Sequence, residues 1–152
     1  MTGAPVCVAG GTEQPNGWDS DWVNFFREKR LMHQVNLTGN KTLIELGKSV
    51  SNGLDKLFEG ITVTPSVLHG DLWSGNIASV DGKPSVFDPA TYYGHAEADF
   101  GMSWCAGFSD TFYKAYWEVN PKQPGFEKRR DLYLVYVPWG SCCGSYAAWP
   151  AY

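Results

Sequence analysis

The sequence lacks long hydrophobic runs, and it lacks an excess of positive charge. No apolar stretch approaches the roughly 20 residues that a membrane-spanning helix needs. The opening segment has neither the basic part nor the sustained apolar part of a signal peptide. The sequence has 12 Lys and Arg residues and 16 Asp and Glu residues, which gives a net charge of −4. Proteins that bind nucleic acid or anionic lipid are usually basic. We therefore expect a cytoplasmic protein that binds neither nucleic acid nor membranes.

Cysteine is also scarce and is not arranged as in a metal site. The four cysteines, Cys7, Cys105, Cys142 and Cys143, lack the paired spacing of zinc ligands, and the adjacent pair suits no ordinary disulfide. We expect reduced thiols, as is usual in the cytoplasm. With 43% hydrophobic and 18% charged residues, the 152-residue chain is able to build the core of one domain of ordinary size.

The first part of the chain predicts a loop followed by two helices. Residues 1–17 are rich in Gly, Pro and other small residues, which indicates a loop or linker. Asp19 or Ser20 is placed to cap a first helix, and a second helix is predicted from about residue 41 to 58, where apolar residues recur every three or four positions. The residues expected to face the core are Trp18, Trp22, Phe25 and Phe26 in the first segment, and Leu43, Leu46, Val50, Leu54, Leu57 and Phe58 in the second.

The next part predicts short strands and then further helices. A strand at 67–68 leads into HGDLWSGN, and strands at 77–80 and 84–87 flank Asp81-Gly82, a pair that tolerates the positive φ values of a tight hairpin turn. A loop is expected around 92–94, followed by helices at about 96–105, 109–118 and 125–136. The predicted organisation is a loop or linker (1–17), a main domain (18–136) and an atypical, uncharged C-terminal tail (137–152).

The run from His69 to Asn76, HGDLWSGN, is called the candidate catalytic loop below, and it matches the needs of phosphoryl transfer from ATP. That reaction needs a carboxylate to orient the attacking hydroxyl and accept its proton, and hard oxygen ligands to hold magnesium against the phosphates. Protein kinases place an Asp and, five positions later, an Asn on one loop, with a second Asp after the next hairpin. Here Asp71 and Asn76 are five apart, and Asp88 follows the predicted hairpin. The array predicts a kinase-type loop that His69 braces.

Plainer interpretations exist for the same residues. Asp71 and Asp88 are able to act as turn residues, and Asn76 as an Asx-turn residue. Trp73 is either a packing residue or a platform for a ligand.

Outside the loop, three expectations concern charged and polar side chains. His95 is expected to cap the helix that it opens, and Asp99 either helps to cap it or ties that helix to the candidate catalytic loop. His33 is expected at the surface or at a helix end. The basic cluster Lys128, Arg129 and Arg130 is expected to form a solvated helix face.

HGDLWSGN followed by FDPATYYGHAEADFGM resembles the fructosamine-3-kinase and ketosamine-3-kinase family. The segments QPNGW, WVNFFREKRL and NPKQPGFEKRRDLY are also similar to that family, so the resemblance runs from about residue 10 to 136. The family is similar to the aminoglycoside phosphotransferases and shares the protein-kinase-like fold. The resemblance therefore implies an α+β fold, namely a protein-kinase-like C-terminal lobe that is mostly helical, with a small β-hairpin beside the catalytic loop.

The resemblance also implies an enzyme that uses ATP and Mg²⁺ to phosphorylate the 3-hydroxyl of ketosamines, the sugar adducts of glycated amines. Carried over to this sequence, Asp71 is the catalytic base, while Asn76 and Asp88 bind Mg²⁺ and, through it, the nucleotide. Trp73 is expected to stack on the sugar adduct, because a flat aromatic face packs well against the C–H groups of a sugar. The expected partners are glycated protein amines or small ketosamines.

The sequence departs from the family pattern at both ends. Upstream of Asp71 it holds no Gly-rich phosphate loop followed by a strand Lys and a helix Glu, so we expect the N-terminal lobe to be absent and phosphate transfer by this chain alone to be impaired. After DLYLVY the pattern changes to VPWGSCCG. A face that a missing lobe leaves uncovered favours self-association.

Two other functions stay open at this point. One is a non-catalytic module that binds ketosamines or regulates a relative. The other is an aminoglycoside- or choline-type phosphotransferase, because those enzymes share the pattern H-G-D-x4-N with this sequence.

Overall fold

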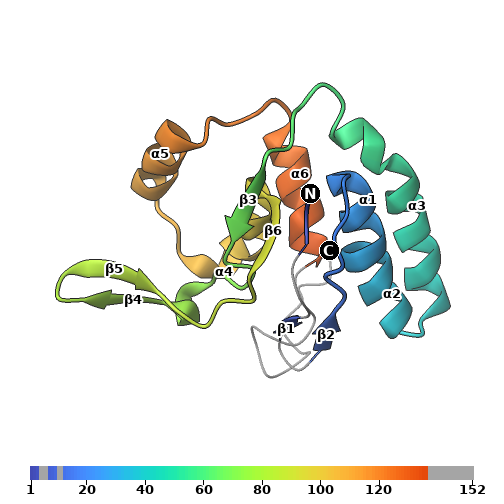
Figure 1. The fold of residues 1–152 in the computed structure, drawn as a ribbon, viewed down its shortest axis with the longest axis horizontal. Coiled ribbons are helices and arrows are strands. Elements are labelled where there is room, and N and C mark those ends of the chain that lie inside the picture. Colours follow the sequence, from blue (N-terminus) through green and yellow to red (C-terminus); the bar gives the residue numbers. More distant parts are fainter. Residues whose placement is uncertain (4–6, 10–11, 137–152) are drawn as a thin grey trace.

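The computed structural model describes residues 1–3, 7–9 and 12–136, and these residues form an α+β fold with short antiparallel strands. At its centre, β3 (Pro65–Leu68) pairs with β6 (Tyr92–His95), so that Leu68 lies opposite Tyr92. In Figure 1 this pair and helix α6 (Phe126–Tyr136) lie between two groups of elements. One group is α1 (Trp22–Phe26), α2 (His33–Leu37) and α3 (Lys41–Leu57), and the other is α5 (Asp110–Val119) and the hairpin of β4 (Ile77–Val80) and β5 (Lys83–Val86).

The N-terminal segment contains more structure than the predicted loop. Two short strands, β1 (Cys7–Ala9) and β2 (Thr12–Gln14), pair with each other, and isolated bridges join Thr2 to Asp19 and Gly3 to Tyr93. Arg30 is fully buried, and its guanidinium donates to the carbonyl of Pro15 at 3.0 Å. The prediction of a loop over 1–17 was therefore incomplete, because it missed the short local pair β1–β2 and the contacts with Asp19, Arg30 and Tyr93.

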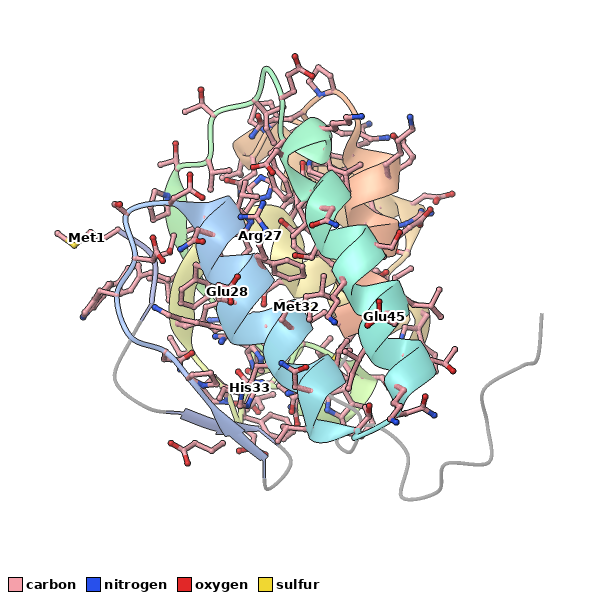
Figure 2. The ribbon with its side chains drawn as sticks, turned by 90° about the vertical axis from the view of Figure 1, so that its right-hand side faces the viewer. Met1, Arg27, Glu28, Met32, His33 and Glu45 are labelled. Carbon is pink, nitrogen blue, oxygen red and sulfur yellow. The ribbon has the colours of Figure 1, made fainter. Side chains whose placement is uncertain are left out.

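The first helix begins two residues later than a cap at Asp19 implies. Asp21 is the N-cap, since its side chain accepts a hydrogen bond from the backbone N–H of Asn24 at 2.6 Å. Asp19 supports the cap from outside by accepting from the N–H of Asp21 at 2.9 Å. Figure 2 shows that α1, the π-helical segment Arg27–Met32 and α2 form one continuous rod beside α3.

The aromatic side chains of this rod form the predicted core, with one exception. Trp22, Phe25 and Phe26 are buried; Trp22 and Phe26 contact the ring of Tyr133 in α6, and Phe25 stacks on Trp22 and Tyr92. Trp18 was expected in the same core, but its side chain is 55% exposed. It lies before the N-cap and therefore does not follow the helical periodicity that places the other three inward.

Helix α3 is capped by Asn40 and confirms the predicted amphipathic helix, but its apolar stripe is only partly covered. Leu54 is fully buried, whereas Leu46 and Val50 are 58% and 40% exposed. An apolar hollow of about 190 Å³ lies between this half of α3 and the end of α6 at Val135 and Tyr136. The described residues bury the C-terminal half of the predicted stripe and leave its N-terminal half open.

The second half of the chain follows the predictions closely, apart from one strand. The predicted hairpin and the last two helices are confirmed within about one residue. The expected loop at 92–94 is instead part of β6, and the expected helix at 96–105 is the 3₁₀ segment η3 (Ala96–Met102) followed by the short helix α4 (Ser103–Ala106). The strand was missed because its pairing partner, β3, lies more than 20 residues earlier.

A buried polar network joins η3 to the helices, and it corrects two predictions. His95 does not cap η3 with its side chain; its ring is 3% exposed, and Nδ1 lies 2.8 Å from the hydroxyl of Tyr133. Arg129, expected on a solvated face, is 1% exposed and donates from Nε and Nη2 to the two carboxylate oxygens of Glu97, at 2.7 and 2.9 Å. Loss of one partner of such a pair leaves a buried charge uncompensated, at a cost of about 3–5 kcal/mol.

Three further expectations concern the surface, the thiols and membranes. His33 lies at the start of α2, and its Nε2 is 3.1 Å from the carbonyl oxygen of Glu13. The thiol of Cys105 donates to the carbonyl of Met102 at 3.4 Å, whereas Cys142, Cys143 and the predicted tail lie outside the described residues. Among the helices of the described ranges, none combines the length and the apolar character needed to cross a membrane.

The buried His95 predicts a loss of stability in mild acid. Burial lowers the pKa of His95 to about 4 from the usual 6.5, so between these pH values the unfolded chain binds a proton that the folded chain does not. The free energy of unfolding should therefore be independent of His95 above about pH 7.5 and fall by about 1.5 kcal/mol between pH 6.5 and pH 5. Urea unfolding at several pH values measures this fall.

The variant His95→Gln serves as the control for this prediction. It removes the titrating ring, so its stability should be lower at neutral pH but should change much less between pH 6.5 and pH 5. Equal pH dependence of the wild type and the variant would show that other groups cause the acid sensitivity.

Candidate functional site

The candidate catalytic loop follows β3 directly, and the hairpin brings the chain back beside it. The loop ends in the 3₁₀ turn η2 (Ser74–Asn76), and β4 begins at the next residue. Asp81 and Gly82 both have positive φ, 52° and 74°, which is the conformation expected of a two-residue hairpin turn. At the open end of the hairpin, the N–H of Phe87 donates to the carbonyl of Asn76 at 3.1 Å. Asp88, the next residue, is thereby placed against the loop.

Asn76 is the point at which the three predicted site residues meet. Its Nδ2 donates to the backbone oxygen of Asp71 at 2.9 Å and to Oδ2 of Asp71 at 3.1 Å, and it lies 3.4 Å from the backbone oxygen of Asp88. Because all three neighbours are acceptors, they fix which end of the amide is nitrogen. The amide oxygen is therefore the atom of Asn76 that stays available to a ligand.

Asp71 presents one carboxylate oxygen that is not used within the described structure. Oδ2 accepts from Asn76, whereas Oδ1 is buried and has no hydrogen-bond partner among the described residues. Burial raises the pKa of Asp71; the hydrogen bond from Asn76 and the nearby His69 ring act in the opposite direction, and the charge of Asp88 adds to the rise. A carboxylate with a raised pKa and an unpartnered oxygen is suited to act as a proton acceptor.

His69 braces the loop, as the sequence predicts, and its contacts define its tautomer. Nε2 lies 3.0 Å from the carbonyl oxygen of Phe87, which is an acceptor only, so Nε2 carries the hydrogen. Nδ1 then accepts from the N–H of Asp71 at 3.3 Å. Both nitrogens of the ring are used to hold backbone groups, which agrees with a structural rather than a reactive role.

Asp99 ties η3 to the candidate catalytic loop, which is one of the two roles predicted for it. Its carboxylate accepts the backbone N–H of His69 at 2.9 Å and that of Gly70 at 2.8 Å, one on each oxygen. Burial raises the pKa of Asp99, and the two backbone hydrogen bonds partly offset this rise. Asp99 thus ties η3 to the start of the candidate catalytic loop.

Gly70 allows the loop to cross the chain that follows Asp88. Its φ is +79°, and a Cβ added there would lie 2.2 Å from the backbone oxygen of Ala90. The crossing is fixed by a hydrogen bond from the N–H of Ala90 to the carbonyl of His69 at 2.8 Å. Ala90 and Phe87 contribute through main-chain atoms only, so a search for functional side chains does not find them.

Trp73 is half-buried, and its ring folds over Gly75. A Cβ at position 75 would lie 2.2 Å from the indole, so the ring occupies space that any larger residue would fill. Trp73 therefore makes a packing contact, and part of Trp73 stays exposed on the same loop as Asp71.

The donor atoms of the site fit magnesium. Within the described residues, no group of three or more His, Cys, Asp or Glu side chains is placed to hold a metal ion. Magnesium, however, is commonly bound by one or two carboxylates, with the other positions filled by water and substrate phosphates. The free amide oxygen of Asn76 and the carboxylate of Asp88 offer hard oxygen ligands of this kind. Asp88 is exposed and has a φ of +55°, a left-handed conformation that Asp tolerates better than most residues.

Comparisons with known proteins indicate one family. The family model described as fructosamine kinase matches residues 6–141. The chain is 54% identical over 132 residues to a chloroplastic protein-ribulosamine 3-kinase of Oryza sativa subsp. indica, with 84% of this chain covered. It is 38% identical over 136 residues to the ketosamine-3-kinase of Mus musculus, with 86% of this chain covered.

Solved structures give the same result, and all of these relatives are longer than this chain. Two crystal structures whose names refer to fructosamine-3-kinase, from Haemophilus somnus and Thermobifida fusca, superpose with TM-scores of 0.77 and 0.78 at 32% and 31% identity. Each covers 89% of this chain, and the matched part is 47% and 49% of the solved chain. The chain spans 39% of the rice relative and 44% of the mouse relative.

The support that Asp99 gives to the loop predicts the effect of Asp99→Ala. This change leaves two backbone N–H groups without an acceptor, and each buried donor so orphaned costs about 1–3 kcal/mol. Amide hydrogen exchange at His69 and Gly70 should therefore accelerate by at least about tenfold. The surface variant Asp131→Ala, which removes an exposed carboxylate from α6, should leave both amides unchanged. Unaltered exchange at these amides in a folded Asp99→Ala variant would contradict the bracing role.

Proposed function

We propose a function from the premise that this chain belongs to the fructosamine kinase family. The proposal is that the chain carries the catalytic loop and the metal ligands of an ATP-dependent ketosamine 3-kinase. The observation that supports this best is the convergence at Asn76, whose Nδ2 contacts the carboxylate of Asp71 and the backbone of Asp88. The proposed base and one proposed metal ligand thus belong to one hydrogen-bonded unit, which also includes the backbone of Asp88, the second proposed ligand. Phosphoryl transfer from ATP to a hydroxyl group needs this combination.

Asp71 is proposed as the catalytic base, acting through its half-buried carboxylate. The 3-hydroxyl of the ketosamine would donate to this carboxylate, and its oxygen would form a bond to the γ-phosphorus of ATP. The bond from this phosphorus to the β–γ bridging oxygen breaks, ADP leaves, and the hydroxyl proton passes to Asp71. The raised pKa of Asp71 makes it a stronger base than an exposed Asp.

Asn76 and Asp88 are proposed to hold Mg²⁺. When bound, the ion would neutralise negative charge on the phosphates of ATP. On the protein side, the three contacts of Asn76 Nδ2 fix the amide so that its oxygen keeps one orientation. The hydrogen bond between Phe87 and Asn76 sets the distance between the two ligands, because it closes the hairpin immediately before Asp88.

The substrate class is proposed from the names of the relatives, which are ribulosamine and ketosamine 3-kinases. Trp73 is proposed to stack on the sugar part of the adduct. Its half-buried ring, held against Gly75, offers a fixed aromatic face two residues from Asp71. Rigid aromatic faces suit the C–H surface of a sugar, whereas the hydroxyl groups bind elsewhere.

Turnover by this chain alone is proposed to be slow. The chain spans less than half of the relatives reported above, and its sequence upstream of Asp71 holds no Gly-rich phosphate loop followed by a strand Lys. In kinases these parts align the phosphates of ATP with the attacking hydroxyl. The residues around Asp71 would then provide the base and the metal ligands without the full alignment of the nucleotide.

The catalytic role of Asp71 predicts the outcome of Asp71→Asn. The substitution keeps the shape and the hydrogen bond from Asn76 but removes the base, so ketosamine-dependent ADP release should fall by about 10²–10⁴-fold. The matched control is Asp81→Asn, which changes an exposed carboxylate in the hairpin turn, where Asn also tolerates the positive φ of 52°. The assay uses a small ribulosamine with ATP and Mg²⁺, and it is repeated with an aminoglycoside. Equal rates in Asp71→Asn and the wild type would refute the proposal, and a preference for the aminoglycoside would refute the substrate class.

The proposed stacking role predicts a graded effect at Trp73. Trp73→Ala should raise the KM for the ribulosamine by about 3- to 10-fold, whereas Trp73→Phe should raise it less, because it keeps an aromatic face. The KM for ATP should stay the same in both variants. Thermal unfolding of both variants serves as the control for the packing contact with Gly75. If both variants lose stability while the ribulosamine KM is unaffected, Trp73 is a packing residue only.

A further inference from the structure

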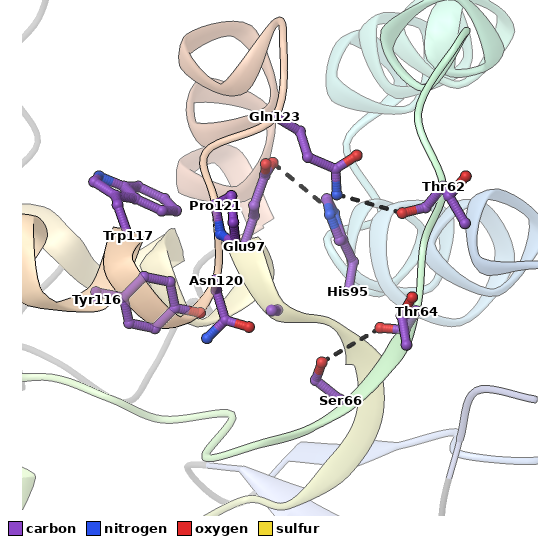
Figure 3. Close-up of a pocket in the computed structure, with 11 residues that line it drawn as sticks. Thr62, Thr64, Ser66, His95, Glu97, Tyr116, Trp117, Asn120, Pro121 and Gln123 are labelled. Atoms are coloured by element: carbon purple, nitrogen blue, oxygen red, sulfur yellow. Dashed lines mark hydrogen bonds and ion pairs between the residues drawn. The ribbon is translucent and has the colours of Figure 1, made fainter.

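A second pocket lies at the end of β3 that is remote from the candidate catalytic loop (Figure 3). The loop follows Leu68 at the C-terminal end of the strand, whereas this pocket, of about 150 Å³, is lined from Thr62 to Ser66 at the N-terminal end. Its other walls come from the start of η3 and from the connection between α5 and α6. None of the residues 69–76 lines it, so it is separate from the proposed active site.

The ionisable side chains that face this pocket carry no uncompensated charge. Both oxygens of Glu97 are engaged by Arg129, so the carboxylate and the guanidinium neutralise each other. Burial lowers the pKa of His95 to about 4 and raises that of Tyr116 to about 12, so both rings are uncharged near neutral pH. A charged ligand would lose its hydration here without gaining a counter-charge.

The pocket floor presents a hydrogen-bond donor whose direction is fixed by its neighbours. The indole N–H of Trp22 donates to the hydroxyl oxygen of Tyr133 at 3.1 Å, so the hydroxyl hydrogen is left to point at Nδ1 of His95, 2.8 Å away. His95 therefore carries its hydrogen on Nε2. His95 lines the pocket, and no hydrogen bond to Nε2 is found within the described part of the chain, so this N–H is the group of His95 that a ligand in the pocket would pair with.

The walls combine hydroxyl and amide groups with an aromatic face. Thr64, Ser66 and Asn120 supply polar groups, and Trp117 packs edge-on against Tyr116 with the ring centroids 5.1 Å apart. Gln123 joins the two sides, since its Nε2 donates to the carbonyl of Thr62 at 3.3 Å (Figure 3). Such a lining does not favour an apolar molecule, because the polar groups would lose their partners.

From this arrangement we infer that the pocket binds a small, neutral, polyhydroxylated molecule, a polyol or the open or closed form of a short sugar. Hydroxyl groups both donate and accept, so they are able to pair with the N–H of His95 and with the Ser, Thr and amide groups of the walls. The C–H groups of the ligand would pack on Tyr116 and Trp117. A cavity of roughly 150 Å³ takes a molecule about the size of benzene, which corresponds to a polyol of about four carbons.

The test compares three four-carbon probes on the whole chain: erythritol, its acid erythronate, and 1-butanol. Long-range ¹H–¹⁵N NMR of the histidine rings reports on the pocket through His95 and on the candidate catalytic loop through His69. Erythritol should shift the Nε2 resonance of His95 with a dissociation constant on the order of millimolar, as expected for so few atoms. Erythronate and 1-butanol should bind at least about tenfold more weakly, because one is charged and the other offers a single hydroxyl.

Variants of the walls complete the test. Thr64→Val and Ser66→Ala each remove one hydroxyl from the pocket and should weaken erythritol binding by about 3- to 10-fold, while Ser79→Ala, on the exposed hairpin, should not. The inference is overturned if erythritol shifts His69 and not His95, if His95 does not respond at 100 mM erythritol, or if erythronate or 1-butanol binds as well. Binding that is the same in both wall variants as in the wild type would also overturn it. None of these outcomes depends on whether the chain transfers phosphate.

Discussion

The two hydrogen bonds from the backbone of His69 and Gly70 to the carboxylate of Asp99 are the constraint on which the rest of the site depends. They fix the point where β3 becomes the candidate catalytic loop. Asp99 belongs to the 3₁₀ segment η3, and another residue of η3, Glu97, pairs with Arg129 of α6. Because 3₁₀ geometry projects residues two apart to different sides, one short segment connects the loop to the helical core. The position of Asp71 is therefore set by buried contacts that lie outside the loop.

The hairpin supplies the second constraint, and it acts through unusual backbone conformations. Gly70 crosses so close to Ala90 that no side chain fits, and Asp88 is held at a positive φ. For a residue other than glycine, such as Asp88, this conformation costs free energy and persists only where the surrounding contacts determine it. Here the contacts are those of Asn76. Its side chain bonds to the backbone of Asp71 in the loop and lies against the backbone of Asp88, and its carbonyl accepts from the N–H of Phe87. The strain is thus concentrated where the proposed base and metal ligands meet.

These features divide into those that local sequence specifies and those that it does not. The turn at Asp81-Gly82, the limits of the last two helices and the meeting of Asp71 with Asn76 follow from short-range patterns, and the structure agrees with them. The burial of Arg129 could not be predicted in this way, because its partner lies 32 residues earlier and the neighbouring Lys and Arg suggest a solvated face. Strand β6 was missed for a similar reason, since its sequence gains a strand conformation only by pairing with β3. These two errors therefore concern contacts that join distant parts of the chain.

The two proposed sites at the ends of β3 differ in their electrostatics, and this difference explains their different ligands. At the C-terminal end, burial raises the pKa of Asp71 and the negative charge of Asp88 adds to the rise, and a magnesium ion is able to balance these two carboxylates. At the N-terminal end, every charge is paired before a ligand arrives, so only neutral hydrogen-bonding groups gain by entering. The contacts that hold both sites all come from residues 22–133, within the described structure. The geometry of the loop and the alignment of ATP are therefore separate requirements, and the first is met by this chain alone.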